Sequence, residues 1–193
     1  MKNVTVFCGS NSGFRAEYAE AAKNLARLLS EQNIRLIYGG GKVGLMGIIA
    51  DEVMRRGGEV IGIIPESLDK KEIAHRGITE LRIVGSMHER KALMAELTDG
   101  FVAMPGGIGT FEEFFEILTW AQLGFHYKPC GILNVAGYYD GLLGLCDNAV
   151  SEGFLRDEHR RLILDETDAE RLLVKMRDFK PPTTRKWIDE ADL

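Results

Sequence analysis

The sequence predicts an open α/β protein with a Rossmann-like, doubly wound and mainly parallel sheet that has helices on both faces. Short apolar runs alternate with amphipathic segments, and glycine-bearing turns join them, which is the pattern of repeated βαβ units. The apolar runs are continuous rather than alternating, as in strands that helices cover on both faces. In such sheets, ligands bind beyond the carboxyl ends of the strands.

The predicted strands are short runs rich in β-branched and large apolar residues. They cover residues 4–8, 34–38, 60–64, 79–84, 100–104 and 130–135. The predicted helices have apolar residues at spacings of three and four. They cover residues 18–30, 45–56, 86–94, 114–120, 139–152, 157–161 and 168–179. A polar connection is expected at 66–77, between the third and fourth strands.

The size and charge of the chain restrict its function. The 193 residues suit one domain, which we assign to residues 1–180, followed by a polar tail at 181–193. The net charge of −5 disfavours nucleic acid as a partner, because a phosphate backbone requires a basic face. No apolar run is long enough to span a bilayer, and no secretory signal precedes the first strand. We therefore expect neither a nucleic-acid nor a membrane partner.

The cysteines and histidines predict no metal site and no disulfide. The three cysteines, Cys8, Cys130 and Cys146, lie far apart, and we expect them to be reduced thiols in a cytoplasmic protein. Cys8 stands at a strand end and is expected to be a small core residue. The four histidines are scattered without the spacing of metal ligands.

One glycine-rich stretch, Pro105–Thr110, joins a predicted strand to a predicted helix. Such a turn lets backbone N–H groups approach an anion, and the helix N-terminus adds a partial positive charge. Two carboxylates, Glu112 and Glu113, follow directly. Because successive helix positions point about 100° apart, only one of them can readily face the crevice. The stretch predicts a phosphate cradle with a catalytic carboxylate beside it.

Two further glycine-bearing loops are expected at the same sheet edge, and neither matches a phosphate-binding motif. Residues 9–13 lack the dinucleotide fingerprint, and residues 39–47 lack the serine or threonine that follows the lysine of a Walker A motif. Lys42 in the second loop has two interpretations: a phosphate contact, or a solvated lysine beside a tight turn.

Arg90 and Lys91 lie early in the helix that precedes the strand of the glycine motif, with Ser86 as its predicted N-cap. The helix dipole disfavours positive charge at this end. Either the two cations form surface charge pairs, or Arg90 points at the ligand crevice. In the second case Arg90 binds a phosphate or a carboxylate bidentately, and it shares one site with Glu113.

The helix after Glu113 is apolar over more than one stripe, with Ile117, Leu118, Trp120 and Leu123 on it. A helix this apolar is either central or covered by a second subunit.

These motifs resemble those of the Lonely Guy family of cytokinin-activating phosphoribohydrolases, many of which are labelled in error as lysine decarboxylases. Residues 105–113 are similar to the PGGxGTxxE motif of that family, and residues 87–94 to its MHxRKxxM segment. Residues 39–41, 119–124, 128–129 and 137–139 also resemble the family. The likeness covers about residues 2–179.

The resemblance implies hydrolysis of the N-glycosidic bond of a nucleoside 5′-monophosphate, such as AMP or N6-prenylated AMP. The products are a free base and ribose 5-phosphate. It implies no cofactor, and a homodimer with sites near the subunit interface. It also implies that Arg90 and Glu113 form the catalytic pair. The substrate-binding positions that it implies are Glu72, Lys91, Gly106, Gly107, Ile108, Gly109, Thr110 and Thr119.

The implied chemistry is coherent. Breaking the bond between C1′ and the base builds positive charge on the ribose, and a carboxylate stabilises that charge and orients or deprotonates a water. Glu113 fits this role, and we expect Arg90 to keep it ionised, since an opposite charge lowers the pKa of a carboxyl. Binding of the phosphate in the glycine loop positions C1′. The sequence leaves open which group protonates the leaving base and which base is preferred.

Two other functions are compatible with parts of the sequence. A nucleotide-binding or carrier module without hydrolysis would use the same glycine loops, but it would not need the Arg90 and Glu113 pair. A pyridoxal-phosphate lysine decarboxylase needs a Schiff-base lysine and an acidic partner for the pyridinium nitrogen, and no lysine of this sequence stands in a distinctive setting.

Overall fold

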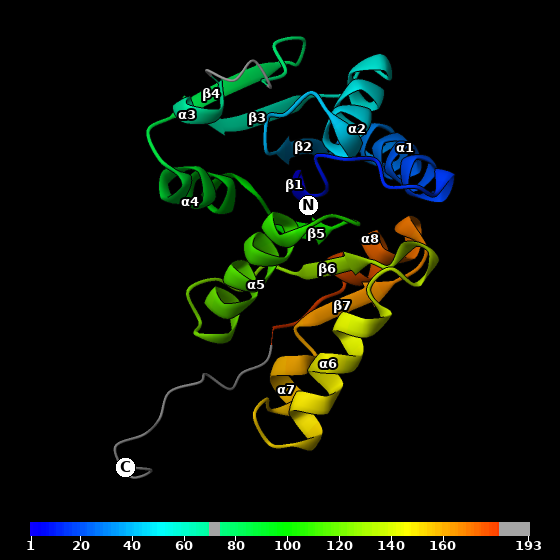
Figure 1. Cartoon of the computed structure of the whole chain (residues 1–193), viewed down its shortest axis with the longest axis vertical. Helices are drawn as coiled ribbons and strands as arrows, with labels where there is room; N and C mark the ends of the chain where they lie inside the picture. The colour runs from blue at the N-terminus through cyan, green and yellow to red at the C-terminus, as the bar shows by residue number, and fades with distance from the viewer. Residues whose placement is uncertain (70–73, 182–193) are drawn as a thin grey trace.

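The computed structural model describes residues 1–69 and 74–181, and within them one parallel sheet is covered by helices on both faces (Figure 1). Its strands are β1 (Asn3–Phe7), β2 (Arg35–Tyr38), β3 (Val60–Pro65), β4 (Glu80–Val84), β5 (Gly100–Ala103), β6 (Cys130–Leu133) and β7 (Ile163–Glu166). The helices are α1 (Ala16–Glu31), α2 (Gly44–Arg55), α3 (Glu66–Asp69), α4 (Met87–Leu97), α5 (Ile108–Gln122), the 3₁₀ turn η1 (Val135–Gly137), α6 (Asp140–Ser151), α7 (Asp157–Arg160) and α8 (Ala169–Arg177).

The strand order β4-β3-β2-β1-β5-β6-β7 places β1 at the centre of the sheet. The chain builds outward from β1 to β4, crosses back through α4, and then builds outward on the other side from β5. Val4 of β1 pairs with Leu36 of β2 and with Gly100 of β5. The loops that leave β1 and β5 therefore diverge at the carboxyl edge, which creates the crevice where such sheets bind ligands. The predicted doubly wound fold is confirmed.

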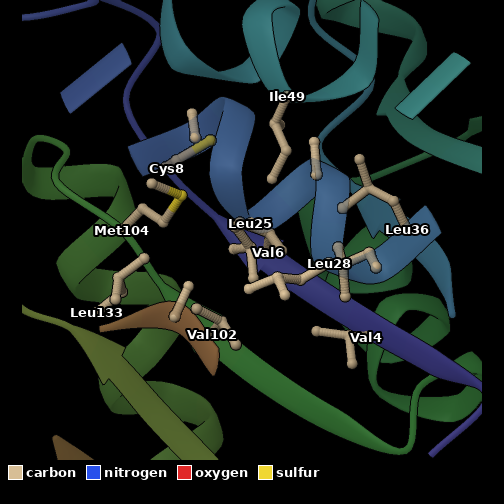
Figure 2. Close-up of a cluster of buried hydrophobic side chains, with 14 of the residues drawn as sticks. Val4, Val6, Cys8, Leu25, Leu28, Leu36, Ile49, Val102, Met104 and Leu133 are labelled. Carbon is tan, nitrogen blue, oxygen red and sulfur yellow. The ribbon is translucent and has the colours of Figure 1, made fainter. Parts of the chain in front are cut away.

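Alternation along β1 divides the core between the two faces of the sheet. Val4, Val6 and Cys8 point to the face covered by α1, α2 and α8, where they pack with Leu25 and Ile49 (Figure 2). On the other face, α4, α5 and α6 cover a second cluster that includes residues of β1, β2 and β5. Cys8 is a buried core residue, as predicted.

The main differences from the predicted elements lie in the second half of the chain. Helix α5 begins at Ile108 rather than at residue 114, because the extended Gly107 is its N-cap. Glu113 therefore lies in the second turn of the helix and not at its mouth. Strand β7 was not predicted, since a four-residue run that ends in two carboxylates resembles a loop. The short elements α3 and η1 were also missed.

Some predictions concern residues outside the described part of the chain. Glu72 is one of them, and so is the predicted tail apart from Pro181, so the division at residue 180 stays a prediction. All three cysteines are buried and unpaired. Among the described helices, none is long and apolar enough to cross a membrane.

Candidate active site

The loops after β1 and β2 are tied together by backbone hydrogen bonds. The N–H groups of Leu45 and Met46 donate to the carbonyl oxygen of Gly9 at 3.0 and 3.3 Å. Gly44 has a φ of +62°, and a Cβ there would lie 2.2 Å from the carbonyl carbon of Ser10. The loop after β1 thus covers the first turn of α2 and accepts hydrogen bonds from its N–H groups. Lys42, beside this turn, is exposed. These contacts favour the interpretation of residues 39–47 as a tight strand-to-helix turn.

The N-terminus of α5, by contrast, is open. Its N-cap is Gly107, which supplies no side-chain cap. Within the described residues, the N–H groups of Ile108, Gly109 and Thr110 donate no hydrogen bond. In α4, the corresponding N–H of Glu89 is satisfied by a serine hydroxyl at 3.1 Å. The first turn of α5 therefore offers unpaired donors and the positive end of a helix dipole, the arrangement that binds anions.

The glycines of this motif have two different physical roles. A Cβ at Gly106 would lie 2.2 Å from the Oγ1 of Thr110 and 2.9 Å from the nitrogen of Gly9, so packing within the chain excludes a side chain there. At Gly107 and Gly109, a Cβ would meet nothing within 4 Å. Their missing side chains leave open space directly above the unpaired donors. Ile108 between them is largely exposed.

Arg90 and Glu113 meet beside this open helix end. The Nη1 of Arg90 is 2.5 Å from the Oε1 of Glu113, and its Nε donates to the carbonyl oxygen of Ile63 at 3.0 Å. Gly39 makes room for the guanidinium, because a Cβ there would lie 2.3 Å from Nη2. Three elements therefore orient one nearly buried arginine, and the two predicted catalytic residues are brought together.

Burial dominates the pKa of Glu113. Desolvation raises the pKa of this carboxyl above its ordinary value, and the charge and hydrogen bond of Arg90 offset only part of that increase. Arg90 therefore acts on this pKa in the expected direction, but it does not outweigh burial, and the pKa of Glu113 lies above rather than below its ordinary value. The cause is the depth at which Glu113 lies, with only 12% of its side chain exposed. A buried carboxyl with a raised pKa is a common feature of sites that use a carboxylate as an acid or base.

Lys91 is held by a second charge cluster next to the first. Its Nζ lies 2.5 Å from the Oε1 of Glu112 and 2.9 Å from the Oε2 of Glu116. Burial lowers the pKa of Lys91, but the two carboxylates outweigh this effect and raise the pKa above its ordinary value. Sequence reasoning missed Glu116, although it follows Glu112 by four residues and therefore shares its face of the helix. Neither Arg90 nor Lys91 is a surface cation.

Replacing Lys91 with methionine is expected to lower the free energy of unfolding by about 2 kcal/mol, because it leaves two carboxylates near each other without their cation. Urea denaturation monitored by circular dichroism measures this loss. Lys23→Met is the matched control, since Lys23 pairs with Glu20 at the surface and such pairs contribute about 1 kcal/mol or less. Equal losses in the two variants would contradict the structural role of Lys91.

Thr119 is not brought to the Arg90 and Glu113 pair. It lies six residues after Glu113 in α5, or roughly 9 Å along the helix axis. Its side chain is exposed, and its Oγ1 donates to the carbonyl oxygen of Phe115 at 2.7 Å. It shares a helix face with Glu112. Its predicted role in substrate binding stays a prediction.

The fold and the site together define a Rossmann-like α/β protein whose central crevice holds an open helix N-terminus beside a buried arginine–glutamate pair. Solved structures confirm the class at the level of fold. The molybdenum cofactor binding protein of Rippkaea orientalis has a TM-score of 0.69 and 18% identity, with 91% of this chain and 94% of that chain covered. The molybdenum cofactor carrier protein of Chlamydomonas reinhardtii has a TM-score of 0.67 and 18% identity, covering 91% and 95%.

Sequence relatives identify the family. A family model described as "Possible lysine decarboxylase" matches residues 46–176. The "Probable cytokinin riboside 5'-monophosphate phosphoribohydrolase LOGL9" of Oryza sativa subsp. japonica is 51% identical, with 93% of this chain and 79% of the relative covered. The cytokinin riboside 5′-monophosphate phosphoribohydrolase LOG2 of Arabidopsis thaliana is 49% identical, covering 93% and 84%. The chain belongs to this family, the Lonely Guy family that its motifs resemble.

Proposed function

We propose that this protein hydrolyses the N-glycosidic bond of adenosine 5′-monophosphates, with AMP or N6-prenylated AMP as substrate, and releases the free base and ribose 5-phosphate. One observation carries the proposal: the buried Arg90 and Glu113 pair lies beside the unpaired N–H donors of α5. Relatives about half identical over most of the chain are named for this reaction.

In the proposed mechanism, the 5′-phosphate binds at the first turn of α5. The unpaired N–H groups of Ile108, Gly109 and Thr110 are its donors. The missing side chains of Gly107 and Gly109 leave room for it, and the tightly packed Gly106 fixes the turn that precedes them. The phosphate is a handle that delivers C1′ to Glu113, which lies about one helical turn, or roughly 5 Å, farther along α5. Glu113 stabilises the positive charge that develops on the ribose, and it orients or deprotonates the attacking water.

Arg90 has two roles in this mechanism. It fixes the carboxylate through the Nη1 contact, and its own orientation is fixed by the carbonyl oxygen of Ile63. Its charge also favours the ionised form of Glu113 and offsets part of the desolvation that raises the pKa of this carboxyl. Lys91, Thr119 and Glu72 complete the proposed substrate-binding set. Lys91 adds a cation next to the cradle, and Thr119 is exposed on the same helix.

The proposal is tested by incubating the protein with AMP and, separately, with isopentenyl-AMP, and by separating the products chromatographically. Free base and ribose 5-phosphate are expected in equal amounts. The ratio of kcat/KM for the two substrates then measures the preference for the prenyl group. A correctly folded protein that releases no base from either nucleotide would contradict the proposed function.

The lysines of the chain do not favour a decarboxylase. Schiff-base formation needs a neutral amine near the crevice, whereas two carboxylates raise the pKa of Lys91 and keep it charged. Burial lowers the pKa of Lys128, but its Nζ donates to the carbonyl oxygen of Ala95 at 2.5 Å. Lys128 also precedes β6, so it lies at the edge of the sheet opposite the crevice. A carrier without hydrolysis would not need a buried carboxylate beside the ligand.

We also propose a homodimer whose interface runs along α4 and α5, the two helices that carry Arg90 and Glu113, so that the sites lie near it. Between α4 and the end of α5, the surface has a hollow whose lining includes Ala92, Trp120 and Phe125. Phe125 is 70% exposed there, and clustered apolar exposure of this kind is typical of an interface. The reduced, buried cysteines support our assignment of the protein to the cytoplasm.

Phe125→Asp is expected to convert the dimer to a monomer in sedimentation velocity. The variant loses roughly 1.5–3 kcal/mol of apolar burial per site and would bury an unpaired charge. Phe154→Asp is the matched control, because Phe154 is also highly exposed but follows α6, outside this hollow. A monomeric wild type, or an unchanged Phe125→Asp dimer, would contradict the proposed interface.

A further inference from the structure

Two consecutive tyrosines after β6 contact the backbone of the glycine motif. The hydroxyl of Tyr139 donates to the carbonyl oxygen of Met104 at 2.7 Å, and that of Tyr138 donates to the carbonyl oxygen of Gly106 at 2.5 Å. The carbonyl oxygen between them, on Pro105, accepts from the N–H of Gly9 at 3.0 Å. Three successive carbonyl groups at the end of β5 are thus each held by a donor from another segment.

This arrangement matters for an anion because a carbonyl oxygen carries partial negative charge. If the peptide after Gly106 turned over, its oxygen would replace its N–H at the surface of the cradle, and the cradle would repel a phosphate instead of binding it. We propose that Tyr138 is a positioning residue for phosphate binding: its hydroxyl holds the Gly106 carbonyl outward and so keeps the N-terminal turn of α5 a surface of donors. This role rests on the proposed function, which supplies the phosphate ligand.

The turn that carries Tyr138 is built to fix its ring. Ala136 and Gly137 both have left-handed backbone angles, with φ of 51° and 71°, so the chain reverses sharply before the tyrosine pair. The side-chain oxygen of Asn134 accepts from the N–H of Tyr139 at 2.8 Å. The ring of Tyr138 then stands edge-on to those of Tyr139 and Tyr18, with centroids 5.0 and 5.8 Å apart. The hydroxyl is therefore directed by packing on two sides.

Tyr138 also borders a cavity of about 250 Å³ between the loop after β1 and residues 105–107. Its side chain is partly exposed, so water can reach the Gly106 carbonyl when the hydroxyl is removed. Tyr139 is only 2% exposed, and its loss would leave a buried carbonyl unpaired, which threatens the fold. Tyr138 is thus the tyrosine whose hydroxyl can be removed to test the cradle without unfolding the protein.

The test compares Tyr138→Phe with Tyr18→Phe by calorimetric titration with AMP and with ribose 5-phosphate. Tyr18 borders the same cavity, but its hydroxyl makes no hydrogen bond in the described residues, so its removal leaves the cradle carbonyls untouched. We expect Tyr138→Phe to raise both Kd values about three- to tenfold, the effect of one hydrogen bond. KM for AMP should rise by a similar factor while kcat changes less than about twofold. Tyr18→Phe should leave both Kd values within about twofold of wild type.

Three outcomes would overturn the role of Tyr138. They are unchanged Kd values in Tyr138→Phe, an equal increase in Tyr18→Phe, and a loss confined to kcat. Because ribose 5-phosphate is a product of the proposed reaction and is not turned over, its Kd measures phosphate binding separately from the proposed function. A wild type that binds AMP but releases no base contradicts hydrolysis and still allows the Tyr138 comparison. A wild type that binds neither AMP nor ribose 5-phosphate overturns both proposals.

Discussion

Replacing Glu113 with glutamine is expected to lower kcat for nucleotide hydrolysis by about a thousandfold or more, the usual effect of removing a catalytic carboxylate. Glutamine has the same shape, and its amide oxygen can still accept the hydrogen bond from Arg90. The change removes the negative charge that stabilises the ribosyl cation and the base that activates water. The N–H groups of α5 that bind the phosphate are unchanged, so Kd for AMP should stay within about tenfold of the wild-type value.

The matched control is Glu112→Gln, one residue earlier on the same helix. Its carboxylate is half exposed and pairs with Lys91, so we expect no more than about a tenfold loss of kcat/KM. Rapid-quench measurement of base release, together with AMP calorimetry on both variants, separates chemistry from binding. Substantial turnover by Glu113→Gln, or equal losses in the two variants, would assign the chemistry to another group.

Most of the fold could be predicted from local pattern alone. Strands β2 and β3 are mainly apolar runs that end at glycine or proline, and the strands in the first half of the chain were each found to within a few residues. Strand β7 was missed because its last residues, Asp165 and Glu166, are carboxylates that a buried strand would exclude. An edge position, with a neighbour on one side, tolerates them. Edge position is a tertiary property that a single sequence does not display.

The site was partly predictable for a similar reason. Arg90 and Glu113 lie on consecutive units of a βαβ pattern, so their meeting at one sheet edge follows from topology. The pKa of Glu113 does not, because it depends on how deeply the folded chain buries this carboxyl and on the charges of Arg90, Glu112 and Lys91 near it. The roles of Gly39 and Tyr138 were equally hidden, since each acts on a group distant in the sequence. Spacing predicts which residues meet, and packing decides what each contact does to charge and orientation.

The glycines show how the structure separates packing from binding. Gly106 has no room for a side chain, so its identity is explained within the chain. Gly109 lies in the first turn of α5 with open space around it, and helix stability alone would favour alanine there. Gly144 of α6 has the same properties: it is helical and exposed, and a Cβ would meet nothing within 4 Å. Only Gly109 stands beside unpaired backbone donors. Comparing substitutions at Gly109 and Gly144 therefore separates an effect on ligand binding from an effect on helix stability.

Gly109→Ala is therefore expected to make the protein more stable and worse at binding. Both Gly109→Ala and Gly144→Ala should raise the free energy of unfolding by a few tenths to about 1 kcal/mol, the helix preference of alanine over glycine. Gly109→Ala alone should raise Kd for AMP and for ribose 5-phosphate, by about tenfold or more, because its methyl group hinders the approach of the phosphate to the adjacent N–H groups. The loss corresponds to roughly 1.5–3 kcal/mol, the worth of a hydrogen bond to a charged group.

Urea denaturation and calorimetric titration of the two variants measure both effects on the same samples. The opposite signs are the decisive feature, because a variant that bound poorly through misfolding would also be less stable. Wild-type affinity in Gly109→Ala would mean that the phosphate does not approach the first turn of α5. The open N–H groups would then need another ligand, and the delivery of C1′ to Glu113 another handle. If Gly144→Ala weakened binding as much, the loss would reflect helix substitution in general, and Gly109 would have no special place in the cradle.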